Sequence, residues 1–337
     1  MLKELSELCG VSGGERAIRE FIKGVIRHDV SQSFEDPYGN LIIRKGREWT
    51  PRILLAAHMD EVGFIVTGID KNGLLRFKTI GIIPHVLLAK RVVVGKKEIP
   101  GVIGHKPVHQ AKEDEMKKLP ETKNLFIDIG VSSKEEAQKL VEIGELGTFA
   151  TQFSELGDSI YGKAFDNRIG CYMLIELIRN TDLPIYGAFT VQEEAGLRGA
   201  KIVGYRVNPH LAIAIDTTAS GEWPAETDAP LYPEIGKGTV ISIADRSLIC
   251  DRRLVSLLEE TAQKNNIPYQ FKRPMIGGTD AGAIHTSRQG VRAAVVQTPA
   301  RYIHSPLSIA SKKDIEAGIQ LLSKSIPRIL REKTLWS

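Results

Sequence analysis

The chain has 337 residues, of which 42% are hydrophobic and 26% are charged. This size exceeds one comfortable hydrophobic core, so we expect a folded protein of two domains, or of one domain with a large insertion, and exclude a disordered chain. The 45 basic and 41 acidic residues give a net charge of +4, and the basic residues are scattered along the sequence. Without a clustered basic patch, we expect no nucleic-acid binding.

Membrane association is not indicated either. No apolar run approaches the roughly 20 residues of a spanning helix, and residues 1–8 alternate Leu with charged residues, unlike a signal peptide. Cys9, Cys171 and Cys250 are far apart and form no C-x-x-C pair, which argues against a disulfide framework or a thiolate zinc site. We therefore expect a cytoplasmic protein.

The first third of the chain predicts a helix and two short strands. Apolar residues recur at spacings of three and four over residues 15–27, which is typical of a helix with one buried face. The β-rich runs 41–43 and 53–57 follow, and the second ends abruptly at His58-Met59-Asp60. Polar residues at the end of a buried strand are candidates for a functional site.

Residues 62–157 have a different texture, with short β-rich runs separated by Gly and Pro. One helix is predicted there, at 134–141, where Ser133 and Glu136 have the spacing of a capping box. This segment predicts a small, mostly β insertion. Its expected strands are 63–69, 74–80, 91–94, 101–104 and 125–129.

From residue 158 onward, predicted helices and strands alternate. Alternation of this kind predicts a mixed, largely parallel α/β sheet covered by helices on both faces. We therefore expect residues 1–61 and 158–337 to form one α/β domain interrupted by the insertion. The expected helices are 167–179, one near 200, 254–264, one near 281 and 311–330, and the expected strands are 185–191, 211–215, 240–243, 269–272 and 293–297.

Histidine and carboxylate side chains gather at the expected strand ends, where ligands bind in an open α/β sheet. Such residues suit Zn²⁺, Co²⁺ or Mn²⁺, and two ions bridged by one carboxylate form a hydrolytic centre. One bridging and four terminal ligands would use five residues and leave one carboxylate free to deprotonate a water. The candidates are His58, Asp60, Asp166, Glu193, Glu194, Asp216 and His304.

Each candidate also has a structural interpretation. An isolated His58 could be an ordinary buried histidine, and Asp166 or Asp216 could cap a helix or a turn. Glu193 and Glu194 point in different directions if the segment is extended, so either could bind metal while the other faces the water. Asp60 is placed to accept the second ring N–H of His58 and fix its tautomer.

Five segments, in order over nearly the whole chain, resemble the M42 family of dinuclear metallo-aminopeptidases. One departure is Gly81-Ile82-Ile83-Pro84, where members of that family commonly carry a Gly-Gly pair. The matching segments are His58-Met59-Asp60-Glu61-Val62-Gly63-Phe64, Gly162-Lys163-Ala164-Phe165-Asp166-Asn167-Arg168, Val191-Gln192-Glu193-Glu194, Gly277-Gly278-Thr279-Asp280-Ala281-Gly282 and Arg301-Tyr302-Ile303-His304-Ser305.

The resemblance implies a role for each site residue. Asp166 would bridge two metals, with His58 and Asp216 on one and Glu194 and His304 on the other, and Glu193 would be the general base. It also implies a phosphopeptidase-like catalytic domain, a PDZ-like or barrel-like dimerisation domain at 62–157, and dimers that assemble into a dodecamer. The two metal ions would be Zn²⁺ or Co²⁺.

We therefore expect an aminopeptidase that cleaves short peptides with a hydroxide activated by two metal ions. Glu193 and Asp60 would carry the catalytic roles beside the metal ligands. A deacylase or amidohydrolase acting on N-acyl amino acids is the main alternative, because related two-metal sites serve both bonds. A catalytically inactive scaffold of the same fold is a further one.

Overall fold

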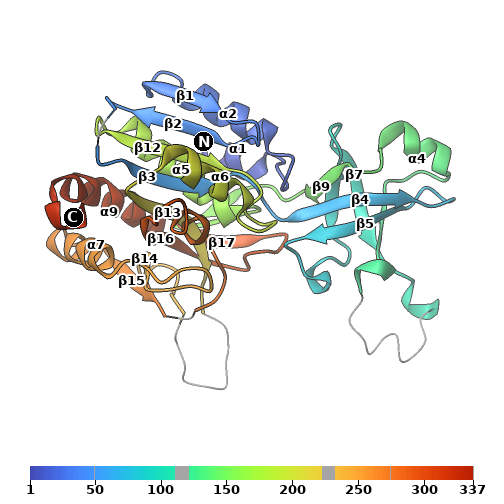
Figure 1. The fold of residues 1–337 in the computed structure, drawn as a ribbon. Helices are drawn as coiled ribbons and strands as arrows, with labels where there is room; N and C mark the ends of the chain where they lie inside the picture. The colour runs from blue at the N-terminus through green and yellow to red at the C-terminus, as the bar shows by residue number, and fades with distance from the viewer. Residues whose placement is uncertain (49, 111–120, 222–231, 274, 337) are drawn as a thin grey trace.

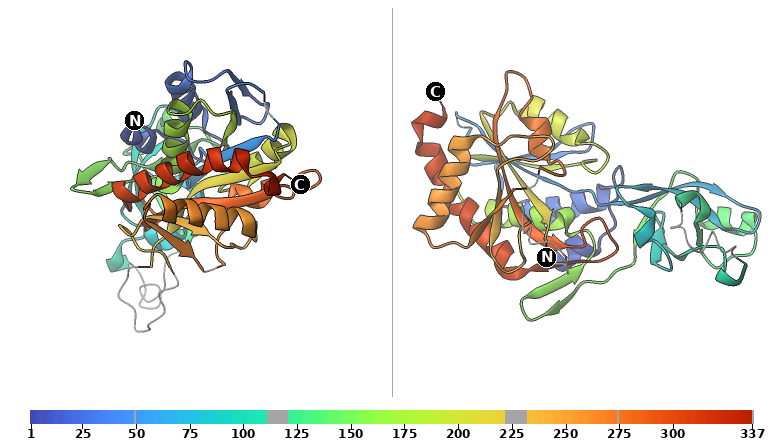
Figure 2. Two further views of the ribbon diagram at one scale, coloured as in Figure 1. Left: turned by 90° about the vertical axis from the view of Figure 1, so that its left-hand side faces the viewer. Right: turned by 90° about the horizontal axis from the view of Figure 1, so that it is seen from below.

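The computed structural model describes residues 1–48, 50–110, 121–221, 232–273 and 275–336, and these form two parts (Figure 1). The larger part is an α/β sheet with its helices, and the smaller part is a β-barrel that projects from one side of it. Strands β4 (Gly63–Ile69) and β5 (Leu75–Ile80) extend between the two parts, as the right-hand view of Figure 2 also shows.

The large sheet has eleven strands in the described part of the chain, and its centre is parallel. The four central strands, at 185–190, 53–58, 211–219 and 292–301, run in the same direction, and antiparallel strands flank them on both sides. The order is β1 (Gln32–Glu35), β2 (Leu41–Lys45), β12 (Ile185–Thr190), β3 (Ile53–His58), β13 (Leu211–Ala219), β16 (Arg292–Arg301), β17 (Ser308–Ser311), β11 (Ser159–Gly162) and β10 (Ser154–Leu156), with β14 (Thr239–Ser242) and β15 (Tyr269–Lys272) branching from β16.

Helices cover both faces of this sheet because its strands are apolar on both sides. Leu55 of β3 faces the larger core, which includes α1 (Leu2–Glu7), α2 (Arg16–Ile26), α5 (Phe165–Arg179), α7 (Arg252–Lys264) and α9 (Lys312–Arg331). Its neighbours Leu54 and Ala56 face the opposite core, which includes α6 (Arg198–Val207) and α8 (Asp280–Ile284). Successive side chains of a strand point to opposite faces of the sheet, which explains why neighbouring residues of β3 belong to different cores.

The smaller part is a closed antiparallel barrel with its own core. Its order is β4, β5, β8 (Phe126–Asp128), β7 (Ile99–Gly104), β6 (Arg91–Val94) and β9 (Leu146–Phe149), and α4 (Lys134–Leu140) packs beside it. Phe64 and Phe77 lie inside with their ring centroids 5.4 Å apart. Closure pairs the strand edges that an isolated sheet of this size would leave exposed.

The predicted α/β fold with a β-rich insertion is confirmed. Two details differ from the sequence-based expectation. The strand expected at 211–215 continues to Ala219, so Asp216 lies inside β13 and not after it. The short strands β1, β9, β10, β11 and β17 were not predicted, and two of them, β1 and β10, are exposed along their whole length and show no alternation. No helix in the described residues is long and apolar enough to cross a membrane.

Candidate metal centre

The predicted site residues come together at the carboxyl edge of the central strands. His58 is the last residue of β3. Asp216 lies in β13, on one side of β3, and the Glu193–Glu194 loop follows β12, on the other side. Two groups of potential ligand atoms form there, each with all its atoms within 4.8 Å of one another. The first group is His58, Glu193 and Asp216, and the second is Asp166, Glu194 and His304.

Asp166 lies between the two groups. One of its carboxylate oxygens, Oδ1, is 3.2 Å from Nε2 of His58, and the other, Oδ2, is 3.2 Å from Nε2 of His304. Residues 166 and 167 depart from helical backbone angles at the start of α5. The Asn167 amide also donates to the Ile215 carbonyl at 2.8 Å, which ties this helix start to β13 beside Asp216.

Both histidines present the same nitrogen to the carboxylates. Nδ1 of His58 lies 3.1 Å from the carbonyl oxygen of Asp60, and Nδ1 of His304 lies 3.1 Å from that of Gly81. Because a carbonyl oxygen can only accept, Nδ1 carries the hydrogen in each ring. Nε2 of both histidines is therefore available as a metal ligand, oriented by a backbone acceptor behind it.

The donor set fits divalent cations. Burial, together with the nearby Asp166 carboxylate, raises the pKa of Glu194 to about 8, and burial also raises the pKa of Glu193 and of Asp216. Glu194 Oε1 is moreover buried without a hydrogen-bond partner. These three carboxylates and Asp166 lie close enough to repel one another, so two dications would offset their combined charge.

The loop that carries the two glutamates is held by side chains that replace a strand ladder. After β12, the backbone N–H of Val191 donates to the side chain of Asn40 at 3.0 Å, and that of Gln192 donates to Glu15 at 3.0 Å. The next two N–H groups, of residues 193 and 194, both donate to the Asp60 carboxylate, at 2.9 and 3.1 Å. Four consecutive N–H groups are thus fixed by acceptors from three distant segments.

Asp60 thereby orients more than a histidine. An oxygen of the Asp60 carboxylate is 3.5 Å from Nδ1 of His58, whereas the backbone carbonyl oxygen of Asp60 is 3.1 Å from the same nitrogen. The Ser12 hydroxyl also donates to this carboxylate, at 2.6 Å. From the sequence, we expected the Asp60 side chain to orient the His58 ring. Its shorter contacts are with the backbone of Glu193 and Glu194, so it positions both glutamates.

Glu15 and Asn40 are positioning residues that the sequence did not reveal. Replacing Glu15 by Ala removes the acceptor that Gly13 and Gln192 share. We expect a loss of about 1–3 kcal/mol of unfolding free energy and a roughly tenfold or larger fall in kcat from a displaced Glu193. Glu15→Gln keeps the acceptor oxygen and should restore kcat. Urea unfolding and steady-state kinetics measure both effects, and an unchanged kcat in the Ala variant contradicts the positioning role.

Arg168 fixes the segment that carries His58 to the segment that carries Asp166. Its side chain is fully buried, and its Nε donates to the Met59 carbonyl at 2.8 Å. The same guanidinium reaches carbonyl oxygens of the N-terminal segment and lies 3.5 Å from Glu61, which itself pairs with Lys163 at 2.8 Å. Because these acceptors satisfy its buried charge, Arg168 holds the segments of the two predicted ligands His58 and Asp166 in a fixed relative position.

Asp280 lies beneath the cluster and does not open to solvent. Its Oδ2 accepts from the Thr190 hydroxyl at 2.5 Å, and its Oδ1 is buried without a hydrogen-bond partner. Burial raises the pKa of this carboxyl to about 7, against the opposing charge of His58. The side chain of Asp280 therefore lies behind β12, where it is held by Thr190.

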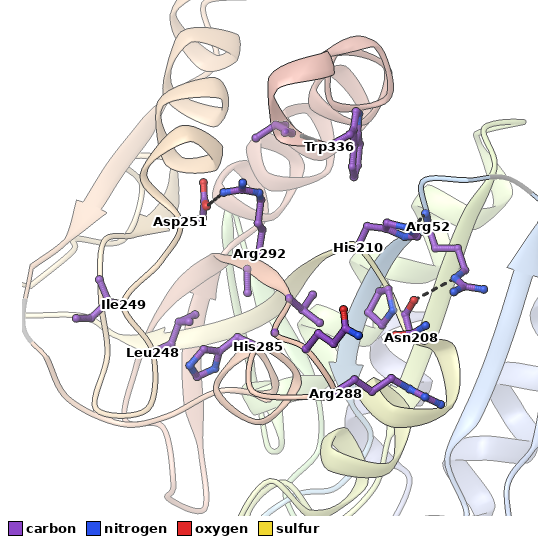
Figure 3. Close-up of a pocket in the computed structure, with 16 residues that line it drawn as sticks. Arg52, Asn208, His210, Leu248, Ile249, Asp251, His285, Arg288, Arg292 and Trp336 are labelled. Carbon is purple, nitrogen blue, oxygen red and sulfur yellow. Dashed lines mark hydrogen bonds and ion pairs between the residues drawn. The ribbon is translucent and has the colours of Figure 1, made fainter.

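A pocket of about 780 Å³ lies at the opposite edge of the sheet (Figure 3). Arg52, His210 and Arg292 line it from the amino ends of β3, β13 and β16. Its carboxylate, Asp251, is already 2.8 Å from Arg292 and accepts the N–H of Leu254 at the start of α7. Among the described residues, the two groups that could hold a metal ion both lie at the carboxyl edge and not in this pocket.

Fold and site together define a class of protein: a hydrolase with a mixed α/β sheet and paired histidine and carboxylate groups that can hold two divalent metal ions. Residues 39–321 match the sequence model of the M42 glutamyl aminopeptidases. The chain belongs to this family, whose members depend on metal, and its activity is that of an aminopeptidase, a peptide hydrolase.

Relatives of known name agree with this assignment over at least 94% of their length. A solved TET aminopeptidase from a marine-sediment Thaumarchaeota archaeon has a TM-score of 0.94 and 38% identity, covering 97% of this chain and 96% of that one. Lysyl aminopeptidase of Pyrococcus furiosus is 34% identical over 334 residues, which are 95% of this chain and 94% of that protein. TET1 peptidase of Pyrococcus horikoshii, which can assemble into a tetrahedron or a large octahedral shell, has a TM-score of 0.87 and 36% identity over 96% and 97% of the chains.

Proposed function

We propose that this chain removes N-terminal residues from short peptides at a centre of two divalent cations. Asp166 would bridge the cations, because its two oxygens each lie 3.2 Å from a histidine of a different group. His58 and Asp216 would complete one site, and Glu194 and His304 the other. The position of Asp166 is the observation that carries the proposal.

Glu193 would act as the general base. Asp166 and the four terminal ligands suffice for both ions, and Glu193 lies 3.9 Å from Nε2 of His58, farther than Asp166 at 3.2 Å or Asp216 at 3.7 Å. Its N–H bond to Asp60 fixes its backbone while its side chain stays beside the first group. From there Glu193 would take a proton from the attacking water and deliver it to the leaving amine.

When bound, the two cations would polarise the scissile carbonyl and lower the pKa of the attacking water. Zn²⁺ or Co²⁺ suits this set of imidazole and carboxylate ligands. The free amino group of the peptide would be held beside the first group, whose histidine is the more buried of the two.

One comparison of substrates tests this function. Aminoacyl p-nitroanilides should be hydrolysed after metal is restored to chelated enzyme, and their N-acetylated counterparts should not, because acetylation removes the amino cation. Cleavage of the acetylated compounds alone would identify a deacylase. No cleavage of either set across all amino acids, with Co²⁺ or Zn²⁺ added, would identify an inactive scaffold.

We further propose that the barrel within residues 62–157 is a dimerisation domain and that dimers assemble into a dodecamer. The P. horikoshii relative, with its tetrahedral and octahedral assemblies, supports a large homo-oligomer. A cytoplasmic location is supported by three cysteines that are all free in the structure. Light scattering of the purified protein measures the assembly directly.

A further inference from the structure

An apolar pocket of about 590 Å³ adjoins the metal centre on the side of His304. It lies between the loop after β5 and the loop after β16, and His304 itself is one of its walls. Four exposed large hydrophobic side chains gather in it, with 38–63% of their surface accessible. They are Ile83, Leu88, Tyr302 and Leu307.

Two contacts make this pocket continuous with the metal cluster. The Gly81 carbonyl accepts from Nδ1 of His304, which joins the two loops. A Cβ atom at Gly81 would lie 3.1 Å from Oε2 of Glu194 and 2.6 Å from Cγ1 of Val62, so the loop passes directly beside a predicted ligand. Gly81 and His304 therefore line the pocket and also lie beside the predicted ligand Glu194 or belong to the cluster itself.

The depth of the cluster indicates which part of a peptide occupies the pocket. The side chain of His58 is 2% exposed, whereas that of His304 is 43% exposed. A peptide that enters with its amino group first places that group at the deep end and extends outward past His304. The pocket therefore lies on the path of the residues that follow the scissile bond.

The chemistry of the walls indicates an apolar side chain. Besides His304, the titratable residues that line the pocket are His85, Lys90 and Tyr302, and no carboxylate is among the described residues there. A lysine or arginine side chain would find no counter-charge, and burying its ammonium or guanidinium group would be unfavourable. An aliphatic or aromatic side chain would cover the exposed Ile83 and Leu88.

Building on the proposed function, we propose that this pocket binds an apolar side chain at the second position of the peptide, directly after the scissile bond. The enzyme then distinguishes substrates by the leaving residue as well as by the N-terminal one. A larger apolar side chain that fills such a pocket is expected to raise kcat/KM by about tenfold or more over a peptide that leaves the pocket empty.

Peptides with one N-terminal residue and Gly, Ala, Leu or Lys at the second position test this inference. We expect kcat/KM for Leu to exceed that for Gly by at least about tenfold, and Lys to show no such gain. Ile83→Ser and Leu88→Ser should each lower the Leu-to-Gly ratio while cleavage of the Gly peptide persists. Ile249→Ser, an exposed position in the pocket of Figure 3, should leave the ratio unchanged.

Equal rates for Gly and Leu in the wild-type enzyme, or an unchanged ratio in both pocket variants, would overturn the inference. If Ile83→Ser instead lowers the oligomer mass in light scattering and leaves the ratio intact, the pocket is a contact between copies of the chain. Failure of the proposed function looks different, because no peptide with a free amino group is then cleaved, whatever its second residue.

Discussion

Replacing Glu193 by Gln is expected to lower kcat by about 10²–10⁴-fold, the range over which a positioned general base accelerates a reaction. Glutamine has nearly the same shape and cannot accept the proton of the attacking water. The backbone N–H of residue 193 keeps its bond to Asp60, so the loop should remain in place. The two predicted metal sites retain their five ligands.

Three measurements on the Gln variant separate this role from others. Steady-state kinetics give kcat, metal analysis gives the number of bound ions, and thermal unfolding tests the fold. We expect the loss in kcat with two ions still bound and little change in Tm. Glu135→Gln, at an exposed position of α4, is the matched control. Near wild-type turnover in Glu193→Gln would refute the base assignment, whereas loss of an ion would make Glu193 a ligand.

Replacing Asp166 by Asn should weaken binding at both metal sites together. The substitution removes the charge of the one carboxylate that contacts both histidines and turns one of its two oxygens into an NH₂ group, which cannot coordinate a cation. Asp216, by contrast, contacts only the His58 group, so Asp216→Asn should weaken one site and spare the other. We expect activity to fall by about 10³-fold in Asp166→Asn, the size of effect seen when a group that stabilises developing charge is lost.

Titration calorimetry of the metal-free proteins with Zn²⁺ or Co²⁺ checks this difference. Wild type should bind two ions, Asp216→Asn one tightly, and Asp166→Asn neither with wild-type affinity. Asp182→Asn, an exposed position distant in sequence from the cluster, controls for the substitution itself. Circular dichroism in the presence of chelator shows whether each variant folds. Two tightly bound ions in Asp166→Asn would remove the bridging assignment.

The sequence by itself determined the plan of the fold. Alternating helix and strand patterns after residue 158 predicted the α/β sheet, and the run 53–57 predicted β3 together with the histidine at its end. Both follow from local properties, because apolar periodicity and β-branched runs are visible along the chain. Six of the seven candidate site residues were also recognisable because they follow apolar runs, and Asp166 because it stands ahead of a predicted helix.

Only the tertiary structure decided what surrounds those residues. Glu15 and Asn40 looked like an ordinary helix start and a turn residue, yet each accepts an N–H beside the two glutamates from more than 150 residues away in the chain. Likewise, Ile83 belongs to the barrel segment and Tyr302 to the α/β domain, and they form one pocket because the barrel returns beside His304. Such contacts depend on long-range packing, and the local pattern of apolar residues does not indicate which distant segments will come into contact.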